Sequence, residues 1–194
     1  MTQVRRSDLT RNDRFGVVLV FFLTAGALGL GLLLRQGTYN QTWSYASREA
    51  GIEAEYPSTW LVDEEGPYVA RIRDPKARPF KTQYIVQVVP AGGQTSVRNV
   101  LDNLTLRRST DLAGYRVLNV EAINVGGATL TEMRFAFVDS DPNPFIQRLP
   151  VVVLGRDVVI LDGDRAIIVT FMAQENKFDE ELGDFQQFLS SLRY

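Results

Sequence analysis

The segment Asp139–Asn143 has the most suggestive chemical spacing in the sequence, because side chains that carry oxygen recur at its first, third and fifth positions. This pattern imitates the opening of a calcium-binding loop, in which such oxygens converge on a hard cation. The loop also needs a glycine at its sixth position and a glutamate at its twelfth, where this sequence has Pro144 and Pro150. A solvated, proline-rich loop is the better interpretation. Because this loop carries Phe145 and Ile146 among polar residues, we expect it to be a docking loop.

Two clusters of carboxylates, Asp63–Glu65 and Asp179–Glu181, are the remaining candidates for acid–base chemistry. A catalytic pair needs a cleft and divergent pKa values, so solvated faces are the better interpretation of both clusters. Ala91–Gly93 lacks the lysine of a phosphate-binding loop, and Gly126-Gly127 lacks the spacing of a dinucleotide fingerprint. The sequence therefore predicts no catalytic, cofactor-binding or metal-ligating residue, and hence a protein that is not an enzyme and holds no cofactor.

Composition narrows the chemistry further, because the 194 residues include neither cysteine nor histidine. Disulfides, thiolate nucleophiles and cysteine-held iron–sulfur clusters are excluded, and the commonest metal and haem ligand is missing. The net charge of −2 provides no field that would attract nucleic acid, and Arg107-Arg108 is the only basic doublet outside the N-terminal tail. A nucleic-acid partner is not expected.

A long apolar stretch runs from Phe15 to Leu34, where 20 residues include no charge and one polar side chain, Thr24. At about 1.5 Å per residue, a helix of this length spans about 30 Å, the thickness of the hydrocarbon core of a bilayer. We expect a transmembrane helix here.

The charges that flank this stretch predict its direction. Four arginines precede it, at positions 5, 6, 11 and 14, whereas Arg35 alone follows closely. Basic residues are retained on the cytoplasmic side, so the N-terminus should be cytoplasmic and the rest of the chain should face the periplasmic side of the cell membrane. The expected organisation is a cytoplasmic basic tail at 1–14, a transmembrane helix at 15–34, a linker at 35–41 and an extracytoplasmic domain at 42–194.

A cleavable signal peptide is the competing interpretation of the stretch, because Ala25-Gly26-Ala27 fits the small-residue cleavage pattern. Against it, the apolar run continues past this point to Leu34, and a mature soluble N-terminus would leave those residues exposed.

Small residues four positions apart, Ala25 with Gly29 and Ala27 with Gly31, lie within the stretch. Such pairs let a second transmembrane helix approach closely. We expect packing against another membrane subunit, while glycine tolerated at random in a membrane helix explains the pattern equally well.

Aromatic residues follow the stretch at Tyr39, Trp43 and Tyr45. Two interpretations fit them: rings at the level of the lipid headgroups, or members of the first strand of the domain.

The C-terminal region shows the alternation of a β-sheet. Three segments have the period of two that marks half-buried strands: 68–73, 84–88 and 132–137. Gly126-Gly127 and Asp162-Gly163 provide turns, the second between two apolar segments as in a hairpin. Val151–Leu161 leaves two possibilities open, since Gly155 to Asp157 forms either a bulge within one strand or a turn between two.

Two amphipathic helices interrupt these strands. The first is expected from about Ser96 to Arg108, with Thr95 or Ser96 as its N-cap. The second begins near Asn176, and its apolar stripe should close the core against the sheet rather than receive a partner helix. The stripe consists of Phe178, Leu182, Phe185, Leu189 and Leu192. The expected fold is α+β, with two helices packed on a mostly antiparallel sheet.

Three stretches of this region resemble the PsbP-like family, the fold of the lumenal extrinsic protein of photosystem II and its bacterial relatives. Gly51–Trp60 is similar to the family's early strand and Tyr-Pro-x-x-Trp turn, Gly126–Val138 to its central hairpin, and Arg165–Leu192 to its last strand and closing helix. The resemblance covers nearly all of 45–194. It implies a non-catalytic protein that docks on a membrane-embedded electron-transfer complex, and no functional residue carries over.

Together these features predict a single-pass accessory subunit of a larger membrane electron-transfer complex. Its partners would be the lipid bilayer and other integral membrane subunits, in a quinol-oxidising assembly such as alternative complex III or in a photosynthetic complex. A membrane-anchored module that binds a ligand or peptide is the alternative, and it requires an apolar pocket with convergent polar groups. A hydrolase would require two buried carboxylates with pKa values pushed apart.

Overall fold

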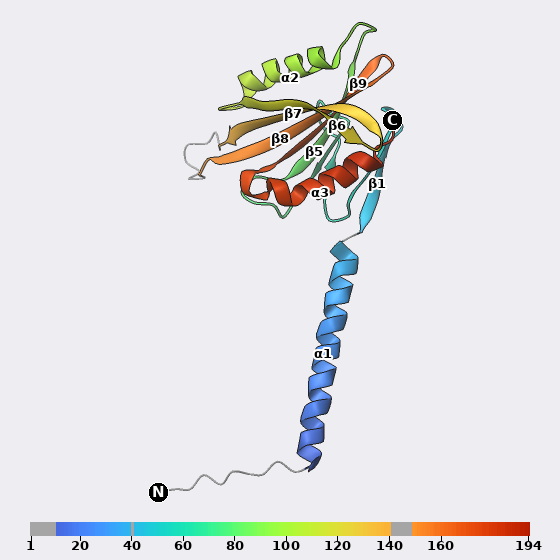
Figure 1. The fold of residues 1–194 in the computed structure, drawn as a ribbon, viewed down its shortest axis with the longest axis vertical. Coiled ribbons are helices and arrows are strands. Elements are labelled where there is room, and N and C mark those ends of the chain that lie inside the picture. Colours follow the sequence, from blue (N-terminus) through green and yellow to red (C-terminus); the bar gives the residue numbers. More distant parts are fainter. Residues whose placement is uncertain (1–10, 40, 141–148) are drawn as a thin grey trace. The chain divides into compact units, whose positions relative to one another are not determined.

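The computed structural model describes residues 11–39, 41–140 and 149–194, and in the first helix it describes side chains from 16 to 31. The chain divides into two units, Met1–Gln41 and Thr42–Tyr194. The first unit contains helix α1, and the second is an α+β domain (Figure 1).

Helix α1 runs from Arg11 to Tyr39, so it includes most of the segment expected as a linker. Every side chain described in it is exposed, and that of Phe22 is 70% exposed. The hydroxyl of Thr24 donates to the carbonyl oxygen of Val20 at 2.8 Å, which satisfies this polar group within the helix. Among the residues that the structure describes, no helix has the length and apolar character needed to cross a membrane.

The domain begins with a two-stranded antiparallel hairpin, formed by β1 (Thr42–Ser47) and β2 (Ile52–Pro57). Gly51 lies in the turn between them at φ 63°, a left-handed conformation that favours glycine. Tyr45 is buried, and its hydroxyl donates to the carbonyl oxygen of Val69 at 3.0 Å. This contact fastens the hairpin to the rest of the domain.

Seven strands form the main sheet in the order β3-β4-β5-β9-β8-β7-β6, and every neighbouring pair is antiparallel. The strands are β3 (Leu61–Asp63), β4 (Ala70–Arg73), β5 (Gln83–Pro90), β6 (Arg116–Val125), β7 (Ala128–Asp139), β8 (Val151–Asp162) and β9 (Arg165–Gln174). The expected α+β fold with a mostly antiparallel sheet is confirmed. Strand β6 forms one border of the sheet, and its outer edge pairs with no described strand.

Strand β8 resolves the ambiguity at Gly155 to Asp157, because it is continuous and keeps an unbroken register with both neighbours. Gly155 is therefore not part of a turn, and its role is in side-chain packing. A Cβ atom at Gly155 would lie 2.1 Å from Cζ of Phe135, the residue opposite it on β7. The missing side chain therefore makes room for the phenyl ring.

The predicted hairpin turns are confirmed on both sides of the central strands. Gly126 and Gly127, at φ 60° and 88°, connect β6 to β7, and Gly163, at φ 60°, connects β8 to β9. These positive φ values favour glycine because it lacks a Cβ atom.

The two helices of the domain cover opposite faces of the sheet (Figure 1). Helix α2 (Val97–Asp111) begins at the predicted N-cap Ser96, whose hydroxyl accepts a hydrogen bond from the backbone N–H of Asn99 at 3.2 Å. Its buried residues Val100, Leu101 and Leu104 pack with alternate residues of β9. The predicted helix is confirmed, and it ends three residues later than expected.

Helix α3 (Glu175–Ser191) closes the other face. Phe178, Phe185 and Leu189 of the predicted stripe are buried, Leu182 is half-buried, and Leu192 follows the end of the helix. Stacked rings continue the core into the sheet, since the centroids of Phe185 and Phe171 are 4.9 Å apart. The interpretation that this stripe closes the core is confirmed.

Candidate functional site

The predicted docking loop lies outside the described residues. Phe145, Ile146 and residues 141–143 all fall in that gap, so both the docking hypothesis and the calcium-loop pattern stay untested. Asp139, the first residue of the pattern, is half-buried at the end of β7. Within 11–39, 41–140 and 149–194, no three acidic side chains gather in a way that could hold a metal ion.

All four small residues of the predicted helix-packing surface lie in α1. Ala25 and Ala27 are exposed, and a Cβ atom added at Gly29 or Gly31 would meet nothing within 4 Å. The backbone at these positions is therefore accessible to another helix. Packing between α1 and a partner stays a prediction.

Asp63 differs from the solvated carboxylate expected at its position. It forms an ion pair with Arg71, and its carboxylate accepts hydrogen bonds from the backbone N–H of Glu65 at 2.9 Å and the hydroxyl of Tyr68 at 3.1 Å. The hydrogen bond from Arg71 is the main reason that the pKa of Asp63 falls to about 2. Glu64 and Glu65 are exposed, as expected.

The second carboxylate cluster also divides. Asp179 and Glu180 are exposed, whereas Glu181 is half-buried against the sheet. Burial raises the pKa of the Glu181 carboxyl, although a hydrogen bond with Thr82 opposes the shift. Burial likewise raises the pKa of the Tyr84 hydroxyl on the neighbouring strand β5.

A buried ion pair joins helix α2 to the sheet. The guanidinium of Arg108 donates to both carboxylate oxygens of Asp157 on β8, with Nη2 2.8 Å from Oδ1. Thr170 of β9 donates its hydroxyl to the same Oδ1 at 2.6 Å, and the guanidinium lies 4.3 Å above the ring of Phe135. Burial alone would lower the pKa of Arg108, yet the charge of Asp157 raises it. The charged pair is therefore stable in this enclosed position.

A second ion pair lies on the opposite face of the same strand. Nη1 of Arg156 is 2.9 Å from Oε2 of Glu132 on β7, and the side chain of Glu132 is fully buried. The contact does not have hydrogen-bond geometry, and neither carboxylate oxygen of Glu132 accepts a hydrogen bond from the described residues. Burial raises the pKa of Glu132, and the nearby charges of Arg156 and Arg134 oppose this shift. Both guanidinium groups approach the ring of Phe178 on α3, at 5.9 and 6.0 Å from its centroid.

These two ion pairs were missed by sequence reasoning, although a signal was present. Arg156 and Asp157 are adjacent charges within an otherwise apolar run, and Glu132 interrupts a strand whose next residue, Met133, is buried. Charges inside a buried strand predict partners on the facing elements. The first pair joins α2 to β8, and the second joins β7 to β8 next to Phe178 of α3.

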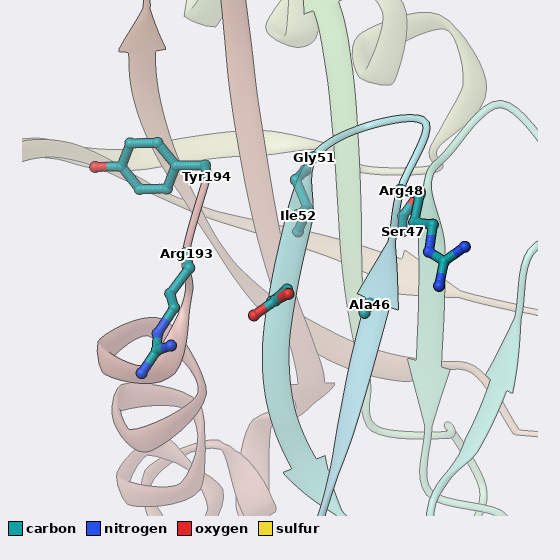
Figure 2. Close-up of a pocket in the computed structure, with 8 residues that line it drawn as sticks. Ala46, Ser47, Arg48, Gly51, Ile52, Arg193 and Tyr194 are labelled. Carbon is teal, nitrogen blue, oxygen red and sulfur yellow. The ribbon is translucent and has the colours of Figure 1, made fainter.

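A shallow hollow of about 270 Å³ lies beside the β1–β2 turn. Figure 2 shows residues from both strands, the turn and the end of the chain around it, among them Arg48, Gly51 and Tyr194. Backbone hydrogen bonds of 3.0 and 2.8 Å between Glu53 and Arg193 hold the chain end against β2. The volume is just below the range of about 300–1,000 Å³ that is typical of ligand sites.

The border strand β6 exposes several apolar side chains along one border of the sheet. Val117, Leu118 and Val120 are 39%, 57% and 51% exposed, and the register against β7 shifts between Val117 and Asn119. Exposed edges of this kind are templates for pairing with another chain, and most proteins protect them with lysine, proline or short strands. Strand β6 is ten residues long and contains neither lysine nor proline. It is therefore a candidate interaction surface.

None of the protein-family models and none of the curated proteins compared with the chain matches it. Solved structures do match at the level of the fold. The solution structure of cyanobacterial PsbP (CyanoP) from Synechocystis has 16% identity and a TM-score of 0.56, and the alignment covers 78% of this chain and 91% of that one.

Two further crystal structures share the architecture. LpqN of Mycobacterium tuberculosis, described as involved in cell envelope biogenesis, has 13% identity and a TM-score of 0.50, over 78% of this chain and 89% of that one. A protein of Bacteroides thetaiotaomicron has 11% identity and a TM-score of 0.51, over 77% of this chain and 47% of that one. Identities this low establish the fold alone, and the fold of the domain is PsbP-like.

Proposed function

We propose that this protein is a non-catalytic, single-pass accessory subunit of a larger membrane electron-transfer complex. The apolar stretch Phe15–Leu34 anchors it, residues 1–14 face the cytoplasm, and the domain covers part of the complex on the periplasmic side. A quinol-oxidising assembly such as alternative complex III, or a photosynthetic complex, is the setting that fits best.

The observation that carries the proposal is the bare apolar surface of α1. Val17 to Leu23 are between 52% and 70% exposed, and no charge interrupts the sequence between Arg14 and Arg35. Such a surface is unfavourable in water and favourable in hydrocarbon. Since a helix also satisfies its own backbone hydrogen bonds, it is one of the structures that can span a bilayer.

The non-catalytic role is supported by how the domain uses its buried charges. Asp157 is neutralised by Arg108 of α2, and Glu132 by Arg156, whose guanidinium lies 5.9 Å from the ring of Phe178 on α3. A general base must lie within hydrogen-bond reach of the substrate proton that it removes. These carboxylates are buried and paired, so a substrate does not reach them.

Assembly with other subunits is supported by two surfaces. The small residues of α1 allow close approach of a second helix within the membrane. Outside it, the edge of β6 offers unpaired backbone groups together with exposed valine and leucine. The PsbP-like resemblance of the sequence implies the same tendency to bind larger assemblies.

Co-purification tests the proposal. Native membranes that contain the chain with a C-terminal tag would be extracted in mild detergent, and the proteins recovered on the tag would be identified and quantified. We expect stoichiometric recovery of haem-, iron–sulfur- or pigment-bearing membrane subunits. Recovery of the chain alone would contradict the proposal.

An anchored ligand- or peptide-binding module is the second candidate, and the hollow beside the β1–β2 turn is the observation that favours it. Its lining includes Arg48, Arg193 and the ring of Tyr194 (Figure 2). If the tagged chain is recovered alone, screening small molecules and peptides for shifts in its melting temperature would test this second function.

A further inference from the structure

We propose that the end of the domain that carries Trp43 and Leu61 lies against the headgroup layer of the bilayer. The inference rests on the proposed function, because it needs α1 to span the membrane. It adds a second contact with lipid, made by the folded domain itself.

Trp43 is the clearest mark of this surface. Its side chain is 61% exposed, although Tyr45, two residues later on the same side of β1, is buried. Trp43 pairs across the hairpin with Tyr56, which is also buried. On this side of β1, Tyr45 therefore belongs to the core, whereas Trp43 lies beyond the core, at the end where the chain enters the domain.

Leu61 belongs to the same end of the domain. Thr42 pairs with Pro57, and a turn closed by the hydrogen bond from the Trp60 N–H to the Pro57 carbonyl oxygen, 2.9 Å long, leads directly to Leu61. The side chain of Leu61 is 54% exposed. Two large apolar side chains are thus exposed next to the point at which the anchor joins the domain.

The length of the connecting chain keeps this end near the membrane. From Leu34 to Tyr39 the chain is helical, which adds about 7 Å along the axis, and the four steps from Tyr39 to Trp43 add at most about 14 Å. Even fully extended, this is shorter than the width of a domain of this size, about 30 Å or more. The start of the domain therefore stays within about 21 Å of the end of the apolar stretch, which keeps Trp43 within reach of the headgroup layer.

The chemistry of the two side chains identifies lipid as the partner. An indole has an apolar ring and one N–H donor, which suits the boundary between headgroups and acyl chains, where tryptophan is enriched. Leucine adds apolar area without a charge that would need to be desolvated.

Tryptophan fluorescence tests the proposal in the full chain reconstituted into vesicles of phosphatidylcholine and phosphatidylglycerol. The chain contains two tryptophans, and Trp60 is half-buried with its ring 4.7 Å from that of Tyr84. Emission is compared between vesicles with and without lipids brominated near the carbonyl end of the acyl chain. The Trp60→Phe variant reports Trp43, and the Trp43→Phe variant reports Trp60 as the matched control.

We expect bromine to quench at least half of the Trp43 emission and a clearly smaller fraction of the emission of the half-buried Trp60. If Trp60→Phe fails to fold, the wild-type emission minus that of Trp43→Phe gives the Trp43 signal with the core intact. Equal Trp43 emission with and without bromine, in vesicles from which alkaline carbonate does not release the chain, would overturn the inference and leave the anchor standing. Release by carbonate would overturn the anchor and the inference together.

Discussion

Glu132 and Asp157 show how single residues shape this domain, because each is a fully buried carboxylate neutralised by one arginine. The desolvation of two charges costs about as much as their attraction returns, so a buried pair adds little net stability. Removing one partner is different, because it leaves an uncompensated charge in the interior. The cost of losing one partner is therefore a better measure of each pair than its net contribution to stability.

Replacement of Arg156 by methionine should lower the free energy of unfolding by about 3–5 kcal/mol, since Glu132 would lose its ion-pair partner. The double variant Glu132→Leu with Arg156→Met should recover most of that loss, because no buried charge remains. Chemical denaturation of the full chain in detergent, followed by circular dichroism, measures both. A double variant as unstable as the single one would contradict this account of the pair.

Asp63 should make the stability of the domain sensitive to acid. Its pKa falls from an ordinary 3.8 to about 2, so the folded state holds its proton less tightly than the unfolded state does. The resulting stabilisation is fully present above pH 4 and is lost as the pH falls through about 2. The wild type should therefore exceed Asp63→Asn in stability near neutrality, and the difference should vanish towards pH 2.

A control with the opposite sign is available at Glu132, whose pKa is raised by burial. A carboxyl whose pKa is raised on folding makes the folded state less stable as the pH rises above the unfolded pKa of 4.5, so Glu132→Gln should gain on the wild type above that pH. Denaturation midpoints between pH 2 and 7 measure both variants. Difference curves that slope in the same direction would refute the assignments.

At the scale of elements, β8 holds the sheet together because it pairs along its whole length and anchors a helix on each face. Its register with β7 depends on Gly155, which faces the ring of Phe135. We expect Gly155→Ala to destabilise the domain by about 1–3 kcal/mol, because the added methyl overlaps the ring. Thermal and chemical denaturation of the full chain in detergent would measure the change.

Gly183 on α3 provides the matched control, since a Cβ atom there meets nothing within 4 Å. Gly183→Ala should stabilise the domain by about 0.5–1 kcal/mol, because alanine favours the helix. Combining Gly155→Ala with Phe135→Leu should recover part of the loss. Equal effects of the two alanine substitutions would show that the close contact with Phe135 is unimportant.

The difference between local features and contacts made far apart in the sequence explains what the sequence could predict. Helix α3 and the turn at Gly163 depend on neighbours within a few residues, so spacing alone indicated both. The continuity of β8 was ambiguous, because its glycine and adjacent charges are typical of a turn until Phe135 and Arg108 are placed beside them. Arg108 is 49 residues from Asp157, and no local pattern conveys a contact of that separation.

For the whole molecule, the proposed crossing of the membrane and its direction are the first properties to test, and the absence of native cysteine makes the test simple. Single cysteines introduced by Ser7→Cys and by Gln186→Cys, at an exposed position of α3, would be treated with a membrane-impermeant maleimide. We expect labelling of the Gln186→Cys variant in cells with a permeabilised outer envelope, and of the Ser7→Cys variant only after lysis. The unmodified chain gives the background, and the reverse pattern would overturn the proposed orientation.

The free edge of β6 gives a prediction about assembly. Val120→Lys places a charge on an edge that has no lysine, a feature that proteins use to prevent strand pairing. Because Val120 is 51% exposed, the substitution should change the free energy of unfolding by less than about 0.5 kcal/mol. It should nevertheless reduce the recovery of partner subunits on the tagged chain several-fold.

Leu106→Lys is the matched control, since Leu106 is 68% exposed on α2, away from this edge, and should leave recovery unchanged. If both variants recover partners as the wild type does, the complex contacts the domain through another surface, because a lysine at Val120 would otherwise have to be desolvated within the interface.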